Sequence, residues 1–382
     1  MRVLIAPDKF RGTLTAIQAA ESMAAGWRRA RPGDSLDLCP MADGGEGTMA
    51  TLIGALSGRM VRSQVTGPLG DTVLARFGLA RIGTVERVAI VESAEAAGLT
   101  LVPPDQRDIR RASTRGLGEL ISTALDWQPT RLLLCLGGTG TNDGGAGMAL
   151  ALGVRLLQDS GQPIDAGGEG LLGLATIDAS GSDARMKPIR VDACADVDIP
   201  LTGPSGASAL FGPQKGASPK DVQLLDTALR HLADIVRRDL AIDFEHAPGA
   251  GAGGGLGFGA MAFLGARITP GVELVTDALQ IGERIRQTDL AITGEGRFDE
   301  SSLRGKAPSA VLRLAREHGV RAVVICGEAD INPDTRATGA MRIVSMVDRF
   351  GRGPAMGDAV RSLELIADEL GQSISSDDET SR

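Results

Sequence analysis

Residues 289–306, with the sequence DLAITGEGRFDESSLRGK, include two carboxylates and two cations that could act on a ligand; they are Glu295, Asp299, Arg297 and Lys306. The apolar residues 290–292 before them are typical of a short buried strand, and Gly294 and Gly296 allow a tight turn where a ligand can approach the backbone. A helical pattern follows from Pro308. Open α/β sheets build ligand sites in such charged loops at the carboxyl ends of strands. A solvated salt-bridge cluster is the alternative.

A second candidate site is the glycine-rich stretch GGTGTNDGGAG at residues 137–147, which follows a Leu-rich strand pattern at 131–136. Backbone N–H groups of such a loop, at a helix N-terminus, can hold a phosphate or a carboxylate. Asp143 could hold a metal ion. The alternative is a tight turn that packs a helix onto a sheet. The residues expected to bind the anion are Gly138, Thr139, Gly140, Thr141 and Asn142.

Charged residues also follow three other expected strands, at 3–6, 35–41 and 191–197. After the second of these strands a site is the favoured interpretation, and a turn with an Asp cap is the alternative. Lys215 precedes a further helix, whose start is marked by Ser218 and Pro219. The charged residues at these strand ends are Asp8, Lys9, Arg11, Asp43, Glu46 and Asp196.

Composition limits the class of protein. With 382 residues, two domains are expected, and the net charge of −8 without a basic patch argues against a nucleic-acid partner. No apolar run has the length of a signal peptide core or a membrane span, so no membrane role is expected. The four cysteines show no CxxC spacing, which favours reduced thiols and a cytoplasmic protein. A homo-oligomer is possible.

The pattern of elements indicates an α/β protein with two α/β domains. Strands alternate with helices at both chain ends, whereas residues 61–91 are rich in strand patterns joined by the turn GPLGD. We therefore expect a discontinuous first domain (1–62 and 270–371), a second mixed α/β domain (63–269) and a disordered tail (372–382). The GxGxxG in residues 248–259 follows no convincing strand, so we predict a hinge or close-packing segment there instead of a dinucleotide site.

The inventory of reactive residues favours phosphoryl transfer. Only three histidines occur and they are scattered, which argues against a metal cluster of His or Cys and against a Ser-His-Asp triad. No GxSxG or Walker motif is present. Phosphoryl transfer needs carboxylates for Mg²⁺, cations and N–H groups for phosphate charge, and a carboxylate near the attacking hydroxyl. By themselves the residues indicate an enzyme that acts on small anions, such as a kinase.

Six stretches together resemble the bacterial glycerate kinase family, in order and over nearly the whole chain. They are APDKFRGTLTA near the start, PMADGGEGT at 40–48, GGTGTNDGGAG at 137–147, DVDIPLTGPSGASALFGPQKGA at 196–217, GAGGGLGFG at 251–259 and ITGEGRFDESSLRGK at 292–306. The resemblance implies transfer of the ATP γ-phosphoryl group to D-glycerate with Mg²⁺, generally giving 2-phosphoglycerate. It also implies a Rossmann- or flavodoxin-like domain beside a mixed-sheet α/β domain, with the active site in the cleft between them.

Four positions depart from the family pattern. Lys9 stands where the family commonly has Ser, Arg11 where it has Lys, Ile199 where it has Asn, and Ser301 where it has Gln. Arg11 keeps the charge but offers a planar fork in place of an ammonium. Ile199 cannot make the hydrogen bonds of an Asn amide. These differences bear on substrate preference.

The resemblance leads to the following role assignments. We expect Asp43, Asp196 and Lys215 to be catalytic, with one of the two carboxylates as the base. The substrate would contact Asp8, Lys9, Arg11 and Glu46. Besides the 138–142 loop, nucleotide phosphates would contact Gly294, Glu295, Gly296 and Lys306. The metal would be held by Asp299 and Asp143, with Glu295 as an alternative.

Three other functions remain open from the sequence. The first is a kinase that makes 3-phosphoglycerate or acts on another small hydroxy acid. The second is a catalytically silent protein that binds small anions, for which Ile199 is the only support. The third, and poorest, is a dinucleotide oxidoreductase.

Overall fold

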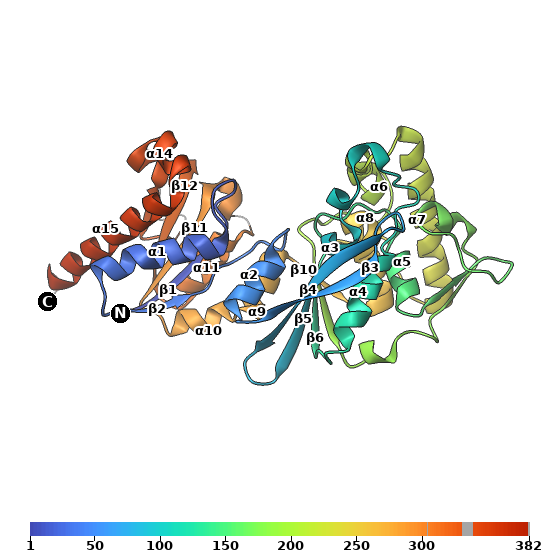
Figure 1. The fold of residues 1–382 in the computed structure, drawn as a ribbon, viewed down its shortest axis with the longest axis horizontal. Coiled ribbons are helices and arrows are strands. Elements are labelled where there is room, and N and C mark those ends of the chain that lie inside the picture. Colours follow the sequence, from blue (N-terminus) through green and yellow to red (C-terminus); the bar gives the residue numbers. More distant parts are fainter. Residues whose placement is uncertain (304, 331–338, 381–382) are drawn as a thin grey trace. The chain divides into compact units, whose positions relative to one another are not determined.

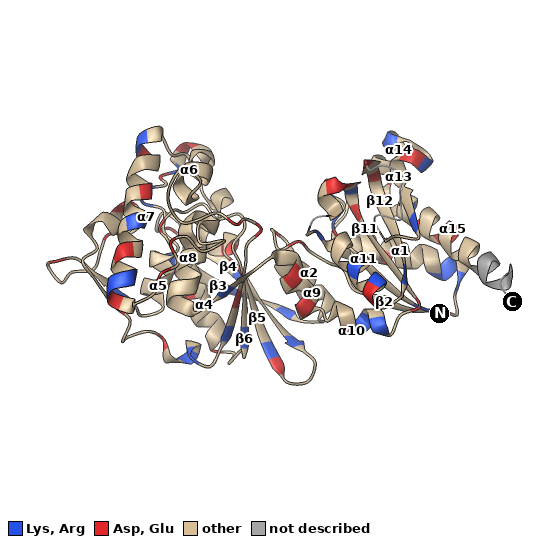
Figure 2. Ribbon diagram, turned by 180° about the vertical axis from the view of Figure 1, so that it is seen from behind, with Lys and Arg blue, Asp and Glu red and all other residues tan. Residues whose placement is uncertain are grey.

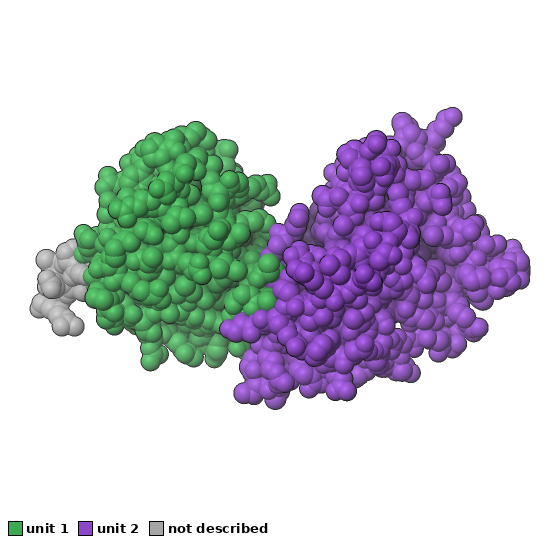
Figure 3. All heavy atoms as spheres, in the orientation of Figure 1, with its two compact units in different colours: residues 1–43, 50–56, 272–382 green, residues 44–49, 57–271 purple. Residues whose placement is uncertain are grey.

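The computed structural model describes residues 1–303, 305–330 and 339–380, and the chain folds into two compact units (Figures 1 and 3). Unit 1 comprises Met1–Asp43, Ala50–Leu56 and Val272–Arg382. Unit 2 comprises Gly44–Met49 and Ser57–Gly271. Both units contain helices packed on a sheet, which confirms the predicted α/β class. The described residues contain no helix of the length and apolarity that a membrane crossing requires.

Unit 1 has a five-stranded parallel sheet with the order β13-β12-β11-β1-β2. Counted along this unit alone, the order is 5-4-3-1-2, which is the flavodoxin-like arrangement. The register places Pro7 of β1 beside Gly294 of β11. The five strands are β1 (Arg2–Pro7), β2 (Ser35–Leu38), β11 (Leu290–Asp299), β12 (Arg321–Asp330) and β13 (Arg342–Ser345).

Helices cover both faces of this sheet, because alternate strand residues are apolar on each side. Val3 and Ile5 share a core with helices α1 and α15, which lie side by side (Figure 1). Helix α11 packs on the same strands from the other face. Thr15 and Gln18 form a capping box at the start of α1. The helices are α1 (Ala16–Ala30), α9 (Gly271–Ala278), α10 (Ile281–Arg286), α11 (Ala307–Glu317), α13 (Met346–Phe350), α14 (Arg352–Gly357) and α15 (Ala359–Thr380).

Helices α9 and α10 are separate because Gln280 adopts a left-handed conformation between them. Helix α15 continues through most of the tail, 372–382, that polar composition predicted to be disordered. Ile374, near the start of this segment, is buried in the core of unit 1.

Unit 2 has a six-stranded mixed sheet with the order β10-β9-β6-β5-β4-β3. The predicted strand-rich segment forms the antiparallel strands β3, β4 and β5, and the remaining pairs are parallel. Cys135 and Cys194 are neighbours at the carboxyl ends of β6 and β9. The strands are β3 (Arg59–Thr66), β4 (Thr72–Ile82), β5 (Glu86–Glu92), β6 (Arg131–Cys135), β9 (Arg190–Cys194) and β10 (Arg267–Thr269). A separate two-stranded sheet joins β7 (Arg155–Leu157) and β8 (Thr176–Asp178).

The glycine-rich segment 248–259 contains a sharp kink just before the regular part of a helix; the predicted hinge stays a prediction. Helix α8 begins at Ala252, with Gly253, Gly254 and Gly255 at positive φ. A Cβ on Gly254 would lie 2.0 Å from the Thr141 carbonyl oxygen, so the close-packing part of the prediction holds. The remaining helices are α2 (Thr48–Ala55), α3 (Ala94–Ala97), α4 (Arg115–Leu125), α5 (Ala146–Ala151), α6 (Ala207–Phe211), α7 (Pro219–Leu240) and α8 (Ala252–Leu264).

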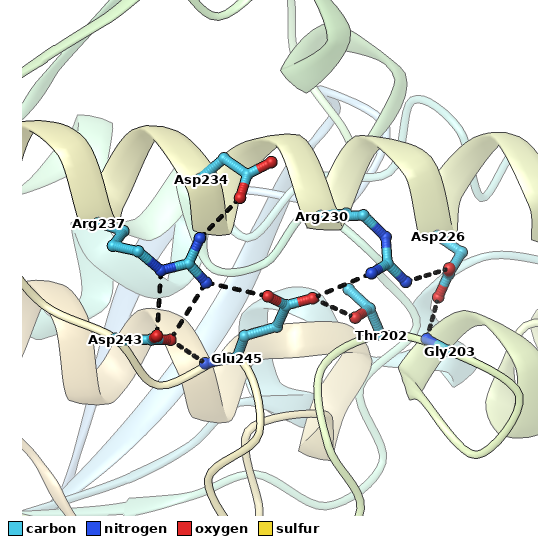
Figure 4. A network of polar contacts seen from close by, with 8 residues as sticks. All are labelled: Thr202, Gly203, Asp226, Arg230, Asp234, Arg237, Asp243 and Glu245. Atoms are coloured by element: carbon cyan, nitrogen blue, oxygen red, sulfur yellow. Dashed lines mark hydrogen bonds and ion pairs between the residues drawn. The ribbon is translucent and has the colours of Figure 1, made fainter.

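A network around the buried carboxylate of Glu245 connects helix α7 to two loops of unit 2 (Figure 4). Acidic and basic residues alternate along α7 (Figure 2). Glu245 accepts a hydrogen bond from Thr202 Oγ1 at 2.6 Å and one from Arg237 at 3.1 Å, and Arg230 lies 3.5 Å away. Since the Leu201 N–H also donates to the Glu245 carbonyl, the network fixes the chain that leads to α6.

We predict that Glu245→Gln lowers the free energy of unfolding by about 1–3 kcal/mol, because it removes a buried charge that satisfies three donors. Urea denaturation followed by circular dichroism would measure the change. Asp234→Asn is the matched control, since Asp234 binds the same Arg237 at 2.7 Å but is mostly exposed. Equal midpoints for the two variants would contradict the prediction.

Candidate active site

Asp8 and Glu295 lie side by side at the carboxyl ends of β1 and β11. The Asp8 N–H donates to the Gly294 carbonyl oxygen at 2.8 Å, which extends the pairing of Pro7 with Gly294 by one residue. Residues in the same register on neighbouring strands point to the same side of the sheet. Both side chains are buried, at 4% exposed for Asp8 and 7% for Glu295. The parallel sheet thus brings two carboxylates together that are far apart in sequence.

Burial raises the pKa of both carboxyl groups. It raises the pKa of Asp8 from 3.8 to about 6, with Asp43 adding to the rise. It raises the pKa of Glu295 from 4.5 to about 7, opposed by a hydrogen bond from Ser302 and by Lys306. The Lys306 ammonium lies 3.8 Å from Glu295 Oε2, whereas Glu295 Oε1 is buried with no hydrogen-bond partner. Both carboxyl groups therefore titrate close to pH 7.

The two basic residues of the loop after β1, Lys9 and Arg11, have different surroundings. Lys9 Nζ lies 3.2 Å from Asp43, and both side chains are about one-third exposed. Arg11 is exposed, and its backbone passes over Gly296, where a Cβ would lie 2.9 Å from the Arg11 nitrogen. Glycine at 296 therefore permits the contact between this loop and the 294–296 turn.

Asp299 is held by its own loop. Its Oδ1 accepts hydrogen bonds from the Ser301 N–H at 2.8 Å and the Ser301 hydroxyl at 2.5 Å. The Ser301 hydroxyl bond is also the first cause that lowers the pKa of Asp299. Ser301 thus uses its side chain to close the 3-10 turn Glu300–Leu303. This favours a structural role for Asp299 over the predicted metal ligation.

In unit 2, a cavity of about 250 Å³ opens at the carboxyl ends of β6 and β9. Most of its wall is glycine backbone and apolar side chains. Asp196, Gln214 and Lys215 supply its charged and amide groups, and Thr139 supplies a hydroxyl. The other lining residues are Gly44, Gly45, Leu99, Leu136, Gly137, Gly138, Cys194, Ala195, Val197, Phe211, Ala252 and Gly253. A mostly apolar hollow with a few convergent polar groups is typical of a small-molecule site.

Lys215 is the most deeply buried charge in the cavity wall, at 3% exposed. Its ammonium donates to the Thr141 carbonyl oxygen at 2.8 Å, and within the described part of the chain no carboxylate lies within 4.0 Å of it. Burial lowers the pKa of Lys215 from 10.5 to about 8, against the opposing effect of Asp143. An ammonium can donate three hydrogen bonds, so this group is suited to bind an anion in the cavity.

The glycine-rich loop 137–147 divides into two parts. Gly138 and Thr139 line the cavity, as expected for an anion loop. Gly140 gives its N–H to the Ala97 carbonyl oxygen, and the Asn142 amide donates to Ser208 at 2.9 Å. Thr141 and Asn142 are fully buried. The second part of the predicted anion loop therefore faces the protein interior.

Asp143 also belongs to the interior, at 1% exposed. Its carboxylate accepts hydrogen bonds from the N–H groups of Thr114, Gly145 and Gly147, at 2.7, 3.1 and 3.2 Å, and from the Thr114 hydroxyl. These bonds occupy both oxygens and fix the start of α5. A structural role is therefore favoured over the metal-binding role predicted from the sequence.

Asp196 lies on the cavity wall and is exposed. Its Oδ1 accepts the Gly271 N–H at 3.0 Å, which orients the carboxylate at the first residue of α9. Glu46 is also exposed. Ile199, in contrast, packs against Gly251, where a Cβ would lie 2.8 Å from the Ile199 side chain. Ile199 is not among the residues that line the described cavity.

Sequence reasoning missed the buried Glu92, at the end of β5. Its carboxylate accepts the Met49 N–H at 2.8 Å and thereby holds the N-terminal end of α2, whose first two residues belong to unit 2. Burial raises the pKa of Glu92. Cys194 similarly donates its thiol to the Gly44 carbonyl oxygen at 3.3 Å. The signal in the sequence that could have identified Glu92 is its position as a single acidic residue at the end of an apolar strand pattern.

Comparison with known proteins agrees with the resemblance found in the sequence. A sequence model of the glycerate kinase family matches residues 3–375. The chain belongs to this family. It is 44% identical over 337 residues to a glycerate kinase of Bacillus subtilis, covering 88% of this chain and 87% of that protein. It is 43% identical over 327 residues to the glycerate 2-kinase of Escherichia coli, covering 86% and 85%.

A solved structure of the family has the same fold. A crystal structure from Salmonella typhimurium LT2, which carries a provisional glycerate kinase 2 name, superposes with a TM-score of 0.90. It is 39% identical and covers 99% of both chains. The likeness extends across unit 1 and unit 2, so the positions of Asp8, Glu295, Asp196 and Lys215 belong to the shared family fold.

We predict that Lys215→Met raises the melting temperature at neutral pH. The folded-state pKa of about 8 lies below the unfolded value of about 10.4, so the cost of burying the charge is fully present below pH 8 and fades as the pH rises toward 10. The advantage of the Met variant should shrink over that interval. Melting curves between pH 6.5 and 9.5 would measure it.

Lys220→Met is the matched control for this prediction, because Lys220 is exposed at the start of α7. Its melting temperature should follow the unmodified protein at every pH. A Lys215→Met curve that runs parallel to the wild-type curve would contradict the assigned pKa.

Proposed function

We propose that the protein is an ATP-dependent glycerate kinase that transfers the γ-phosphoryl group to the 2-hydroxyl of D-glycerate. The observation that carries this proposal is the match of the family over residues 3–375, with 43% identity to a protein named glycerate 2-kinase. The two groups of buried charge support it, since they offer cations, backbone N–H groups and carboxylates to small anions. We place the enzyme in the cytoplasm, because its four cysteines are free thiols.

In this proposal, the unit 2 cavity binds the hydroxy acid. The Lys215 ammonium would contact its carboxylate, and the N–H groups of Gly138 and Thr139 would supply further donors. Asp196 would act as the base. As the glycerate oxygen attacks the γ-phosphorus, the bond from that phosphorus to the bridging oxygen of ADP breaks, and Asp196 takes the hydroxyl proton. Asp196 suits this role because its carboxylate is oriented by Gly271 and remains exposed on the cavity wall.

The cluster of unit 1 would contact the nucleotide phosphates. Lys306 offers an ammonium beside the 294–296 turn, and glycine at 294 and 296 lets a phosphate approach the backbone. Mg²⁺, when bound, neutralises charge on the phosphate oxygens. Lys9 and Arg11 remain candidate contacts for the substrate or the transferring group, with Asp43 orienting Lys9.

The product can be identified by a coupled assay. The protein would be incubated with D-glycerate, ATP and Mg²⁺, and the product coupled to enolase and pyruvate kinase, with and without phosphoglycerate mutase. We expect pyruvate without the mutase. Pyruvate only in its presence would identify a 3-kinase, ADP release without pyruvate would indicate another acceptor, and no turnover would favour a silent anion-binding protein.

The assignment of the base can be tested separately. We predict that Asp196→Asn lowers kcat by about 10²–10⁴-fold, because general-base catalysis is lost while side-chain size is kept. Asp198→Asn is the matched control, since Asp198 is exposed two residues further along the chain. A folded Asp196→Asn enzyme with nearly normal kcat would remove this role.

A further inference from the structure

We propose that Asp8 and Glu295 together bind a divalent cation at the carboxyl ends of β1 and β11. The identification of that cation as the Mg²⁺ of a nucleotide complex rests on the proposed function, whereas the site itself rests on unit 1 alone. The sequence-based prediction named Asp299 and Asp143 as the metal ligands, with Glu295 as an alternative; the pairing of Glu295 with Asp8 is new.

The placement of the two carboxylates is the first observation. They occupy neighbouring positions in the register of two parallel strands, one residue beyond the pair Pro7 and Gly294. Both strands are buried up to this point, so the backbone that carries the carboxylates is rigidly held. A cation shared by two such side chains needs no rearrangement of the sheet.

The second observation is the oxygen Oε1 of Glu295. It is buried and has no hydrogen-bond partner in the described structure, although the residue is only 7% exposed. An unsatisfied buried oxygen on a group that can ionise is costly. The partners of the carboxyl group are Ser302, which donates a hydrogen bond to it, and Lys306, whose ammonium lies 3.8 Å from Oε2. A metal ion would supply the missing partner.

Local charge favours a cation in the same place. Four carboxylates, Asp8, Asp43, Glu295 and Asp299, share this loop cluster with two lysines. Lys9 lies 3.2 Å from Asp43. A divalent cation between Asp8 and Glu295 would relieve the repulsion between these carboxylates.

The ligand set suits Mg²⁺ in particular. The described residues contain no group of three or more His, Cys, Asp or Glu side chains arranged as a metal cage. Mg²⁺ commonly uses one or two carboxylates and completes its six positions with water and substrate phosphate oxygens. Two carboxylates beside Lys306 and the 294–296 backbone meet that requirement.

The cation site can be tested by titrating the full-length protein with Mn²⁺, which accepts the same oxygen ligands as Mg²⁺. The electron paramagnetic resonance signal of free Mn²⁺ would be followed, without nucleotide and with saturating ADP. We expect Glu295→Gln and Asp8→Asn each to weaken Mn²⁺ binding about tenfold or more. Asp299→Asn is the matched control and should stay within about twofold, because Asp299 bonds to its own turn.

Thermal melts would establish that each variant is folded. Glu295→Gln should keep its stability, because it removes a buried charge with an unsatisfied oxygen. Mn²⁺ binding that is unchanged in Glu295→Gln, or lost in Asp299→Asn, would overturn the proposal, and so would a wild-type protein that binds no Mn²⁺ in either condition. Pyruvate formation by the wild-type enzyme would leave the proposed function standing in each of these cases. Conversely, Mn²⁺ binding that depends on Glu295 without kinase turnover would separate the site from the function.

Discussion

The removal of charged side chains from water at the ends of parallel strands is the constraint on which the rest of this structure depends. Asp8, Glu295 and Lys215 are each less than 10% exposed. Burial moves their pKa values from 3.8, 4.5 and 10.5 to about 6, 7 and 8. The pKa values of these groups, which ordinarily lie far apart, are thus all brought close to 7. A bound charge of either sign can then shift their protonation, which is a useful property where phosphate and carboxylate charges move.

Close backbone contacts are what make this burial possible. A Cβ on Gly294 would lie 1.9 Å from the Ile325 carbonyl oxygen, so β11 and β12 can approach beside Glu295 only because this residue is glycine. In unit 2, Gly254 has the same effect, since it lets α8 pack directly on the 137–147 loop. Glycine in these segments therefore has two roles. At some positions it leaves the backbone accessible to a ligand, and at others it permits close packing behind the site.

The sequence was informative where a pattern is local. Apolar strand runs, the strand-rich segment 61–91 and the charged loops at strand ends could all be predicted from neighbouring residues. Which residues of the 137–147 loop face the cavity could not be predicted in this way. Whether Gly138 or Asn142 faces the cavity depends on Ser208 and Ala97, which approach from distant parts of the chain. The same holds for Glu92 and Asp143, whose burial follows from non-local packing.

A comparison of buried charges within unit 2 separates structural groups from functional ones. Asp192 is 1% exposed, yet Arg131, Arg190 and Arg267 surround it at 2.7, 2.9 and 3.3 Å. Glu245 is similarly surrounded by donors. Such groups are satisfied by the fold and need no ligand. Lys215, with one carbonyl partner in a cavity wall, and Glu295 in unit 1, with one oxygen unpaired, are left incomplete at a cost to stability. Since a folded chain gains nothing from an incomplete buried charge, these positions are where a ligand completes the structure.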